Sequence, residues 1–248
     1  MDPIQLATQA QAHIDAGRLE EAAEIYRRIL DQYPGDADTH HILGLVYAEL
    51  AQWDRAREAI AGAIRHNPQK AIFYRSLADA CRSAGDGAAA LAAYKQALQL
   101  SPDDADTLLN LGNLFHAGSD PKKAMACYEK ILATRPDHAP ALNNIGKLHY
   151  DQCDIDSAIK CYNESIQHDA GYAEAHFNRG VAFLLKGDLA RGWPDYEWRF
   201  KRKNAHRVYP HSLHGRRWDG SPFGGERLLV HCEQGLGDVL HFCRYLPM

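Results

Sequence analysis

Small and apolar side chains return along this chain at a fixed interval of 34 residues. Four prolines stand one interval apart, at Pro34, Pro68, Pro102 and Pro136. In the same frame a small residue recurs at Ala10, Gly44, Ala78, Gly112, Gly146 and Gly180, and a large one at Tyr26, Ile60, Tyr94, Tyr128, Tyr162 and Tyr196. Unrelated amphipathic helices would not keep such columns in register, so the chain is predicted to consist of internal repeats.

The repeat at residues 105–138 shows what one unit contains. It carries two apolar stripes at helical spacing, first Leu108, Leu111, Gly112 and Phe115, and then Ala124, Tyr128, Ile131 and Leu132. The intervening Gly-Ser-Asp-Pro segment supplies a helix stop, an N-cap at Asp120 and a proline at the first helical position. Each unit is therefore predicted to be a helix hairpin, in which the small residues let the paired helices approach to about 8–10 Å.

A unit of this length, with Leu-Gly early, an aromatic residue three positions later, then Ala, Tyr and a closing Pro, resembles the tetratricopeptide repeat. The resemblance implies an all-α solenoid, a right-handed superhelix of helix hairpins. Five repeats are expected over residues 3–172 and a sixth, degenerate one over residues 173–203. The fifth departs from the pattern at Ser165, where a small apolar residue is expected, and at Ala170, where the other repeats have proline.

The last 45 residues differ in composition. Residues 204–225 are rich in Pro, Gly, His and Ser and are predicted to form a linker. Residues 226–248, ERLLVHCEQGLGDVLHFCRYLPM, read as a short buried strand, a glycine loop and a helix, the opening of an α/β domain. The fold class expected for the whole chain is therefore an all-α solenoid with a short C-terminal β-α fragment.

This C-terminal segment is similar to the start of the heptosyltransferase-like acceptor lobe in bacterial proteins where tetratricopeptide repeats lead into a glycosyltransferase. The resemblance implies that Asp238 acts as the base on the acceptor hydroxyl and that Gly235 and Gly237 are the loop glycines. It also implies a nucleotide-sugar donor in a longer protein. No cofactor is expected in this chain, because the second lobe of that family is absent from it.

Charge and composition limit the classes of partner that the sequence gives reason to expect. A net charge of −4 gives no reason to expect nucleic acid or membrane binding, and neither a leader nor an 18-residue apolar run is present, so a cytoplasmic protein is expected. No Cys-x-x-Cys pair exists, and no metal site is predicted. The basic run from Arg199 to Arg207 has two interpretations, a solvated helix end or a phosphate contact.

Candidate binding residues lie on the first helices of the repeats, which line the concave side of such a solenoid. Asn110, Asn144 and Asn178 occupy one column, and an asparagine amide can bond both the N–H and the C=O of a peptide. This column resembles the asparagine ladder of the O-linked N-acetylglucosamine transferase superhelix. The alternative is that these amides bond water or the neighbouring repeat. The other predicted peptide-binding residues are Asn113, Asn143, Lys147, Arg75 and Arg82.

Two functions of different class follow. The first is a scaffold that binds an extended peptide or protein segment in the concave groove. The second is the targeting arm of a glycosyltransferase whose catalytic lobes are absent, so that this chain alone is not expected to be catalytic. No catalytic triad or paired carboxylates occur in the repeats. Self-association through the apolar C-terminal segment is also expected, with Trp193, Tyr196 and Phe200 as a docking seam.

Overall fold

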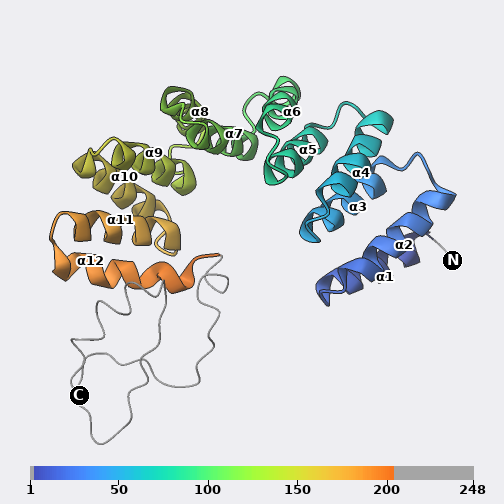
Figure 1. Cartoon of the computed structure of the whole chain (residues 1–248), viewed down its shortest axis with the longest axis horizontal. Coiled ribbons are helices and arrows are strands. Elements are labelled where there is room, and N and C mark those ends of the chain that lie inside the picture. Colours follow the sequence, from blue (N-terminus) through green and yellow to red (C-terminus); the bar gives the residue numbers. More distant parts are fainter. Residues whose placement is uncertain (1–2, 204–248) are drawn as a thin grey trace, which may run out of the picture. The chain divides into compact units, whose positions relative to one another are not determined.

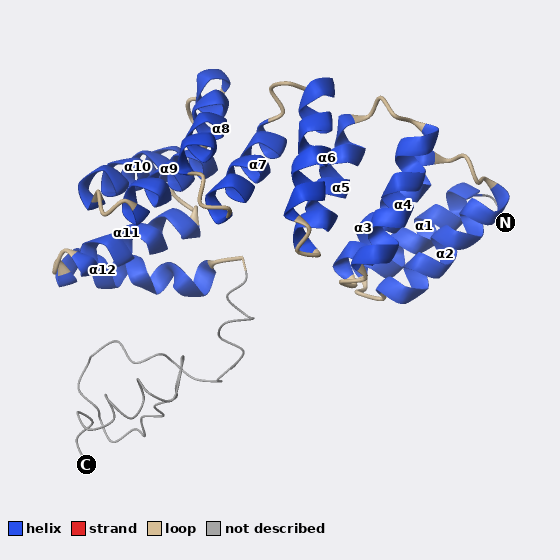
Figure 2. Ribbon diagram, turned by 45° about the horizontal axis from the view of Figure 1, so that its top comes forward, coloured by secondary structure: helices blue, strands red, loops and turns tan. Residues whose placement is uncertain are grey.

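The computed structural model describes residues 3–203. This part of the chain contains twelve α-helices and one 3₁₀ helix, and no strand (Figures 1 and 2). The helices are α1 (Pro3–Asp15), α2 (Leu19–Gln32), α3 (Ala37–Glu49), α4 (Trp53–His66), α5 (Ala71–Ser83), α6 (Gly87–Leu100), α7 (Ala105–Ala117), α8 (Pro121–Thr134), α9 (Ala139–Asp151), α10 (Ile155–His168), α11 (Ala173–Leu185), α12 (Leu189–Tyr196) and η1 (Glu197–Lys201). The predicted linker and the predicted strand-loop-helix lie outside the described residues.

The chain divides into two compact units, one ending at Ala170 and the other beginning at Gly171. We call them the N-terminal and the C-terminal unit. The boundary falls where the fifth repeat lacks the proline that closes the earlier ones. The N-terminal unit holds α1 to α10, which are five helix hairpins, and the C-terminal unit holds α11, α12 and η1.

The second helices of the last four repeats start at an aspartate that recurs once per repeat. Asp86, Asp120, Asp154 and Asp188 each accept a hydrogen bond from the backbone N–H three residues further on. These bonds satisfy amide groups that the first turn of a helix leaves without a partner, and the negative charge suits the helix N-terminus. The predicted N-cap at Asp120 is confirmed, with Pro121 at the start of the helix.

The turn inside each hairpin contains one residue with positive φ. It is glycine in three repeats, at Gly17, Gly85 and Gly187, with φ of 72°, 84° and 80°. In the other three repeats it is Ala51, Ser119 or Cys153, with φ of 55°, 59° and 62°. Left-handed backbone is unfavourable for residues with a Cβ atom, so these three turns carry a conformational cost that the glycine turns do not.

Close approach of the paired helices explains the small-residue column. A Cβ atom added to Gly112 would lie 2.4 Å from Cε1 of Tyr128, and one added to Gly146 would lie 2.5 Å from the same atom of Tyr162. Both tyrosines are completely buried. The predicted pairing of a small residue with a large one is therefore confirmed in these repeats.

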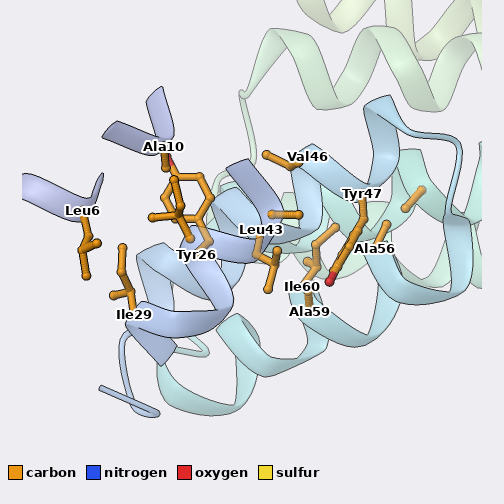
Figure 3. Close-up of a cluster of buried hydrophobic side chains, with 13 residues drawn as sticks. Leu6, Ala10, Tyr26, Ile29, Leu43, Val46, Tyr47, Ala56, Ala59 and Ile60 are labelled. Atoms are coloured by element: carbon orange, nitrogen blue, oxygen red, sulfur yellow. The ribbon is translucent and has the colours of Figure 1, made fainter. Parts of the chain in front are cut away.

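The same arrangement builds the core of the first two repeats (Figure 3). Tyr26 and Ile29 of α2 and Ile60 of α4 are buried with Leu43 and Val46 of α3. The core therefore runs on from one hairpin to the next, because each hairpin covers its apolar stripe with its neighbour.

Repeat stacking leaves one face of the N-terminal unit lined by first helices. Helix α3 packs against α5, α5 against α7, and α7 against α9. Within this unit α2, α4, α6 and α8 each pack against the first helix of the following repeat. We call the exposed side chains of α5, α7 and α9 the first-helix face. It carries most of the residues that the sequence predicted to bind a partner.

Two places where the last repeats depart from the common pattern are explained by the structure. Ser165 stands where an apolar residue was expected, and it is completely buried. Its hydroxyl donates to the carbonyl oxygen of Ala139 at 2.8 Å, so no polar group is left unpaired. Of the three residues of the predicted docking seam, Trp193 and Tyr196 lie on α12, which ends at Tyr196, whereas Phe200 lies on η1. Trp193 and Tyr196 do make an edge contact, with ring centroids 5.8 Å apart.

Candidate functional site

A three-residue hydrogen-bond network links the fourth and fifth repeats on the first-helix face. The hydroxyl of Tyr128, on α8, donates to Oδ1 of Asn113, on α7, at 2.8 Å. The side-chain amide of Asn144, on α9, donates to the same oxygen at 2.8 Å. Both acceptor positions of this oxygen are therefore used. Since the carbonyl group of the Asn113 side chain points into the protein, its NH₂ group points outward, where Asn113 is exposed.

The same network occurs one repeat earlier with a carboxylate in the central place. Oδ1 of Asp79, on α5, accepts from the hydroxyl of Tyr94 and, at 3.0 Å, from the side-chain amide of Asn110. Burial raises the pKa of the Asp79 carboxyl group, although both donors favour its charged form. Burial also raises the pKa of the Tyr94 hydroxyl. Asparagine and aspartate thus accept the same two bonds at this place in successive repeats.

These bonds bear on the predicted asparagine column. The amides of Asn110 and Asn144 both donate to the preceding repeat, which is the alternative that the sequence left open. Asn144 is only 8% exposed, and its Oδ1 accepts from the amide of Asn143 at 3.2 Å. Asn143 is 2% exposed. Asn110 is half-buried, and its side-chain NH₂ group is the one that donates to Asp79.

A pocket of about 260 Å³ opens between α7 and α9. Its lining consists of Asn113, His116, Ala117, Asn144 and Lys147. Three of these residues were predicted to bind a partner, and the structure brings them together. Lys147 is half-buried, and no described residue makes an ion pair with its ammonium group.

The histidine of the pocket is held by a carboxylate from the next repeat. Nε2 of His116 lies 2.5 Å from Oδ2 of Asp151, at the end of α9. This contact fixes the ring at one wall of the pocket. The pocket is therefore lined by the ammonium group of Lys147, the side-chain amide of Asn113, and His116, which is already bonded to Asp151.

The two arginines of α5 that were predicted to bind a partner, Arg75 and Arg82, differ in their contacts. Nη1 of Arg75 lies 3.1 Å from Oδ2 of Asp104 and 2.8 Å from Oδ2 of Asp106, at the start of α7. It therefore joins the third repeat to the fourth. Arg82 is exposed on α5.

Other predicted residues lie elsewhere. Asn178 is half-buried on α11, in the C-terminal unit. Asp238, Gly235 and Gly237 lie outside the described residues. Within residues 3–203, no cluster of His, Cys, Asp and Glu is able to hold a metal ion.

The sequence interpretation missed the role of the tyrosine hydroxyls. It placed Tyr94 and Tyr128 in the core as space-filling residues. The signal was present, because Asp79 and Asn113 stand 15 residues before a tyrosine and 31 residues before a column asparagine. A polar residue that recurs at these two separations indicates a bond both within a repeat and across to the next.

Models of the tetratricopeptide repeat family match four segments of the chain, residues 13–79, 78–118, 105–138 and 143–193. The chain is a tetratricopeptide repeat protein. Proteins of this family generally mediate protein–protein interaction. Within the part of the chain that the structure describes, no helix combines the length and apolar character that crossing a membrane requires. A cytoplasmic location stays a prediction.

One relative matches this chain in sequence, and two solved structures match it in fold. Protein FlbA of Caulobacter vibrioides is 26% identical over 242 residues, which are 94% of this chain and 35% of FlbA. The chain thus spans about a third of the length of that relative. A tetratricopeptide repeat protein from Parabacteroides merdae superposes with a TM-score of 0.69 at 18% identity, covering 83% of each chain. PilF of Pseudomonas aeruginosa superposes with a TM-score of 0.67 at 18% identity, covering 85% of this chain and 93% of PilF.

Proposed function

We propose that the first-helix face binds an extended segment of a protein partner, and that this chain is an interaction scaffold. The observation that carries the proposal is the pocket between α7 and α9, which opens among side chains held by hydrogen bonds within the protein. Side chains that are already fixed lose little conformational freedom when a ligand binds. A volume of about 260 Å³ suits one side chain of a partner better than a free small molecule, whose pockets are usually about 300–1,000 Å³.

The spacing of the repeats suits an extended chain. Neighbouring helices lie about 8–10 Å apart, and a strand rises about 3.3 Å per residue, so each repeat meets about three residues of a partner. Asn110 then faces one peptide group, and the pocket takes a side chain about one repeat further along. In this proposal the bond from Asn110 to Asp79 orients the asparagine, whose carbonyl oxygen accepts from a partner N–H.

The affinity of a captured partner tests the proposal. Asn110→Ala is expected to weaken binding by about 0.5–1.5 kcal/mol. Asn163→Ala is the matched control, because Asn163 is exposed on a second helix, α10. Thermal unfolding of each variant separates loss of binding from loss of fold. Unaltered affinity in Asn110→Ala would remove the proposed asparagine contact.

A second candidate is the targeting arm of a longer enzyme. The match to FlbA extends over most of this chain but over only 35% of the relative, which supports the greater length of such a protein and not its chemistry. The predicted sugar transfer depends on Asp238, Gly235 and Gly237, and on a nucleotide-sugar donor bound by lobes outside this chain. The groove would then hold the protein that receives the sugar.

This candidate is tested with the complete natural protein. If its reading frame continues into two lobes, transfer from a nucleotide-sugar should be abolished by Asp238→Asn while partner capture is unchanged. A purified 248-residue chain is expected to transfer no sugar. If that chain transferred sugar and Asp238→Asn abolished the transfer, the enzyme hypothesis would be preferred to the scaffold.

A further inference from the structure

Large apolar side chains are exposed on the last α-helix of the described repeats. Leu189 and Trp193 lie one turn apart on α12, so they share one side of this helix, and they are 56% and 55% exposed. Leu185, on the last turn of α11, is exposed as well. The outermost repeat of a solenoid usually has a polar outer side. We call Leu189 and Trp193 the terminal apolar face.

The third repeat shows what this side of a second helix contacts. Gly87 and Leu91 stand where Leu189 and Trp193 stand three repeats later. A Cβ atom added to Gly87 would lie 3.9 Å from Cδ1 of Leu114, on the first helix of the following repeat. Leu91 packs against a buried cluster to which the same helix, α7, contributes. Within residues 3–203 no helix follows η1 to cover the terminal apolar face in this way.

A segment further along the chain has the apolar pattern of such a covering helix. In the fifth repeat, three residues of α9 at spacing i, i+4, i+7 are buried in one cluster with Ile131 of α8: Ala141, Ile145 and Leu148. Residues 238–246 lie outside the described residues, and their sequence repeats this spacing at Val239, Cys243 and Leu246. At helical periodicity these three side chains form one stripe.

We propose that residues 238–246 pack on the terminal apolar face of the same chain, in the place that the first helix of a following repeat takes in the earlier repeats. The inference does not depend on the proposed function. It assigns to α12 an intramolecular contact that would bring the C-terminal segment against the end of the repeats.

The connection between the two parts is long enough for this contact. Residues 204–237 separate them, and a flexible chain of that length spans roughly 30 Å on average. Helix α12 has eight residues and is therefore about 12 Å long. A segment tethered in this way is present at an effective concentration in the millimolar range, whereas a second copy or another protein must bind from dilute solution. The tether therefore favours the chain's own segment as the occupant.

Hydroxyl-radical footprinting of the full chain, read by mass spectrometry, measures how exposed Trp193 is in solution. Trp193 is expected to be oxidised severalfold more slowly in wild type than in the double variant Val239→Asp/Leu246→Asp, because a carboxylate on the stripe resists burial. His241→Asp is the matched control. It adds the same charge on the opposite side of the predicted helix and should leave the oxidation rate of Trp193 as in wild type.

A reciprocal change on α12 keeps the test independent of how the double variant folds. Leu189→Asp places a charge on the terminal apolar face, at a residue that is already exposed. It should make alkylation of the Cys243 thiol severalfold faster. Ala190→Asp, at the exposed neighbouring position, is its control and should leave that rate unchanged.

The concentration dependence distinguishes the occupants of the face. Protection of Trp193 that persists on dilution, in a chain that sediments as a monomer, supports the inference. Protection that is lost on dilution would assign the face to a second copy and overturn it. Equal oxidation of Trp193 in wild type and the double variant, with equal alkylation of Cys243 in wild type and Leu189→Asp, would leave the face to a separate protein and overturn it as well.

Discussion

The positive-φ residue of each hairpin turn offers a clean test of backbone strain. Ala51 and Gly85 occupy the same place in the second and third repeats, with φ of 55° and 84°. Ala51 is exposed, and a Cβ atom added to Gly85 would meet nothing within 4 Å. Exchanging alanine and glycine at these two positions therefore changes the backbone preference and almost nothing else.

The magnitude follows from two opposing effects. A left-handed residue with a Cβ atom costs about 1–2 kcal/mol relative to the right-handed form. Glycine loses about 0.4–1 kcal/mol more than alanine on folding, because its unfolded chain is freer. The difference leaves Ala51→Gly more stable than wild type by roughly 0.5–1 kcal/mol, and Gly85→Ala less stable by the same amount.

Urea denaturation followed by circular dichroism measures both changes, and their signs should be opposite. Gly118→Ala is the control in a comparable turn, because Gly118 has φ of −80°. It should be neutral or slightly stabilising, since alanine suits that conformation and restricts the unfolded chain. A stabilising Gly85→Ala, or a destabilising Ala51→Gly, would refute the reasoning.

Three further outcomes are expected. Gly112→Ala should cost about 1–3 kcal/mol in thermal unfolding, because its Cβ atom would lie 2.4 Å from Cε1 of the buried Tyr128; an unchanged melting temperature would count against the helix packing described. Asp79→Asn should raise stability at pH 7, because burial raises the folded-state pKa of the Asp79 carboxyl group and so makes its charged form costly. This advantage should shrink as pH falls through the folded-state pKa and be gone by about pH 4, the pKa of the unfolded state; a pH-independent difference would exclude this cause. Burial raises the pKa of the Cys127 thiol to about 11, so Cys127 should react with iodoacetamide at pH 8 much more slowly than the exposed Cys153. Peptide mass spectrometry measures both rates, and equal rates would contradict the burial of Cys127.

Sequence reasoning succeeded where the determining contacts lie within one hairpin. The small residue at Gly112, the tyrosine at Tyr128 and the cap at Asp120 act on neighbours a fixed number of positions away, so periodicity alone indicates their roles. The tetratricopeptide fold of the described residues followed from these columns.

The site was harder to predict because its contacts cross from one repeat to the next. Asn110 and Asn144 were correctly placed on first helices, but a helical position does not say which atom of an amide faces solvent. That depends on the acceptors supplied by Asp79 and Asn113, and on the hydroxyl of a tyrosine from the second helix. The strong burial of Asn143 likewise depends on how the repeats stack, which the column pattern does not specify.

The central claim, that the first-helix face of the N-terminal unit binds a protein partner, is tested most directly by photocross-linking. A benzoylphenylalanine replaces Ala117, which lines the pocket and is exposed, and in a matched variant it replaces Ala126, which is exposed on α8. Neither change touches the hydrogen-bond network. Irradiation in living cells is expected to join a discrete protein to the Ala117 variant and not to the Ala126 variant. Cross-linking from Ala126 alone, or equally from both positions, would contradict the claim.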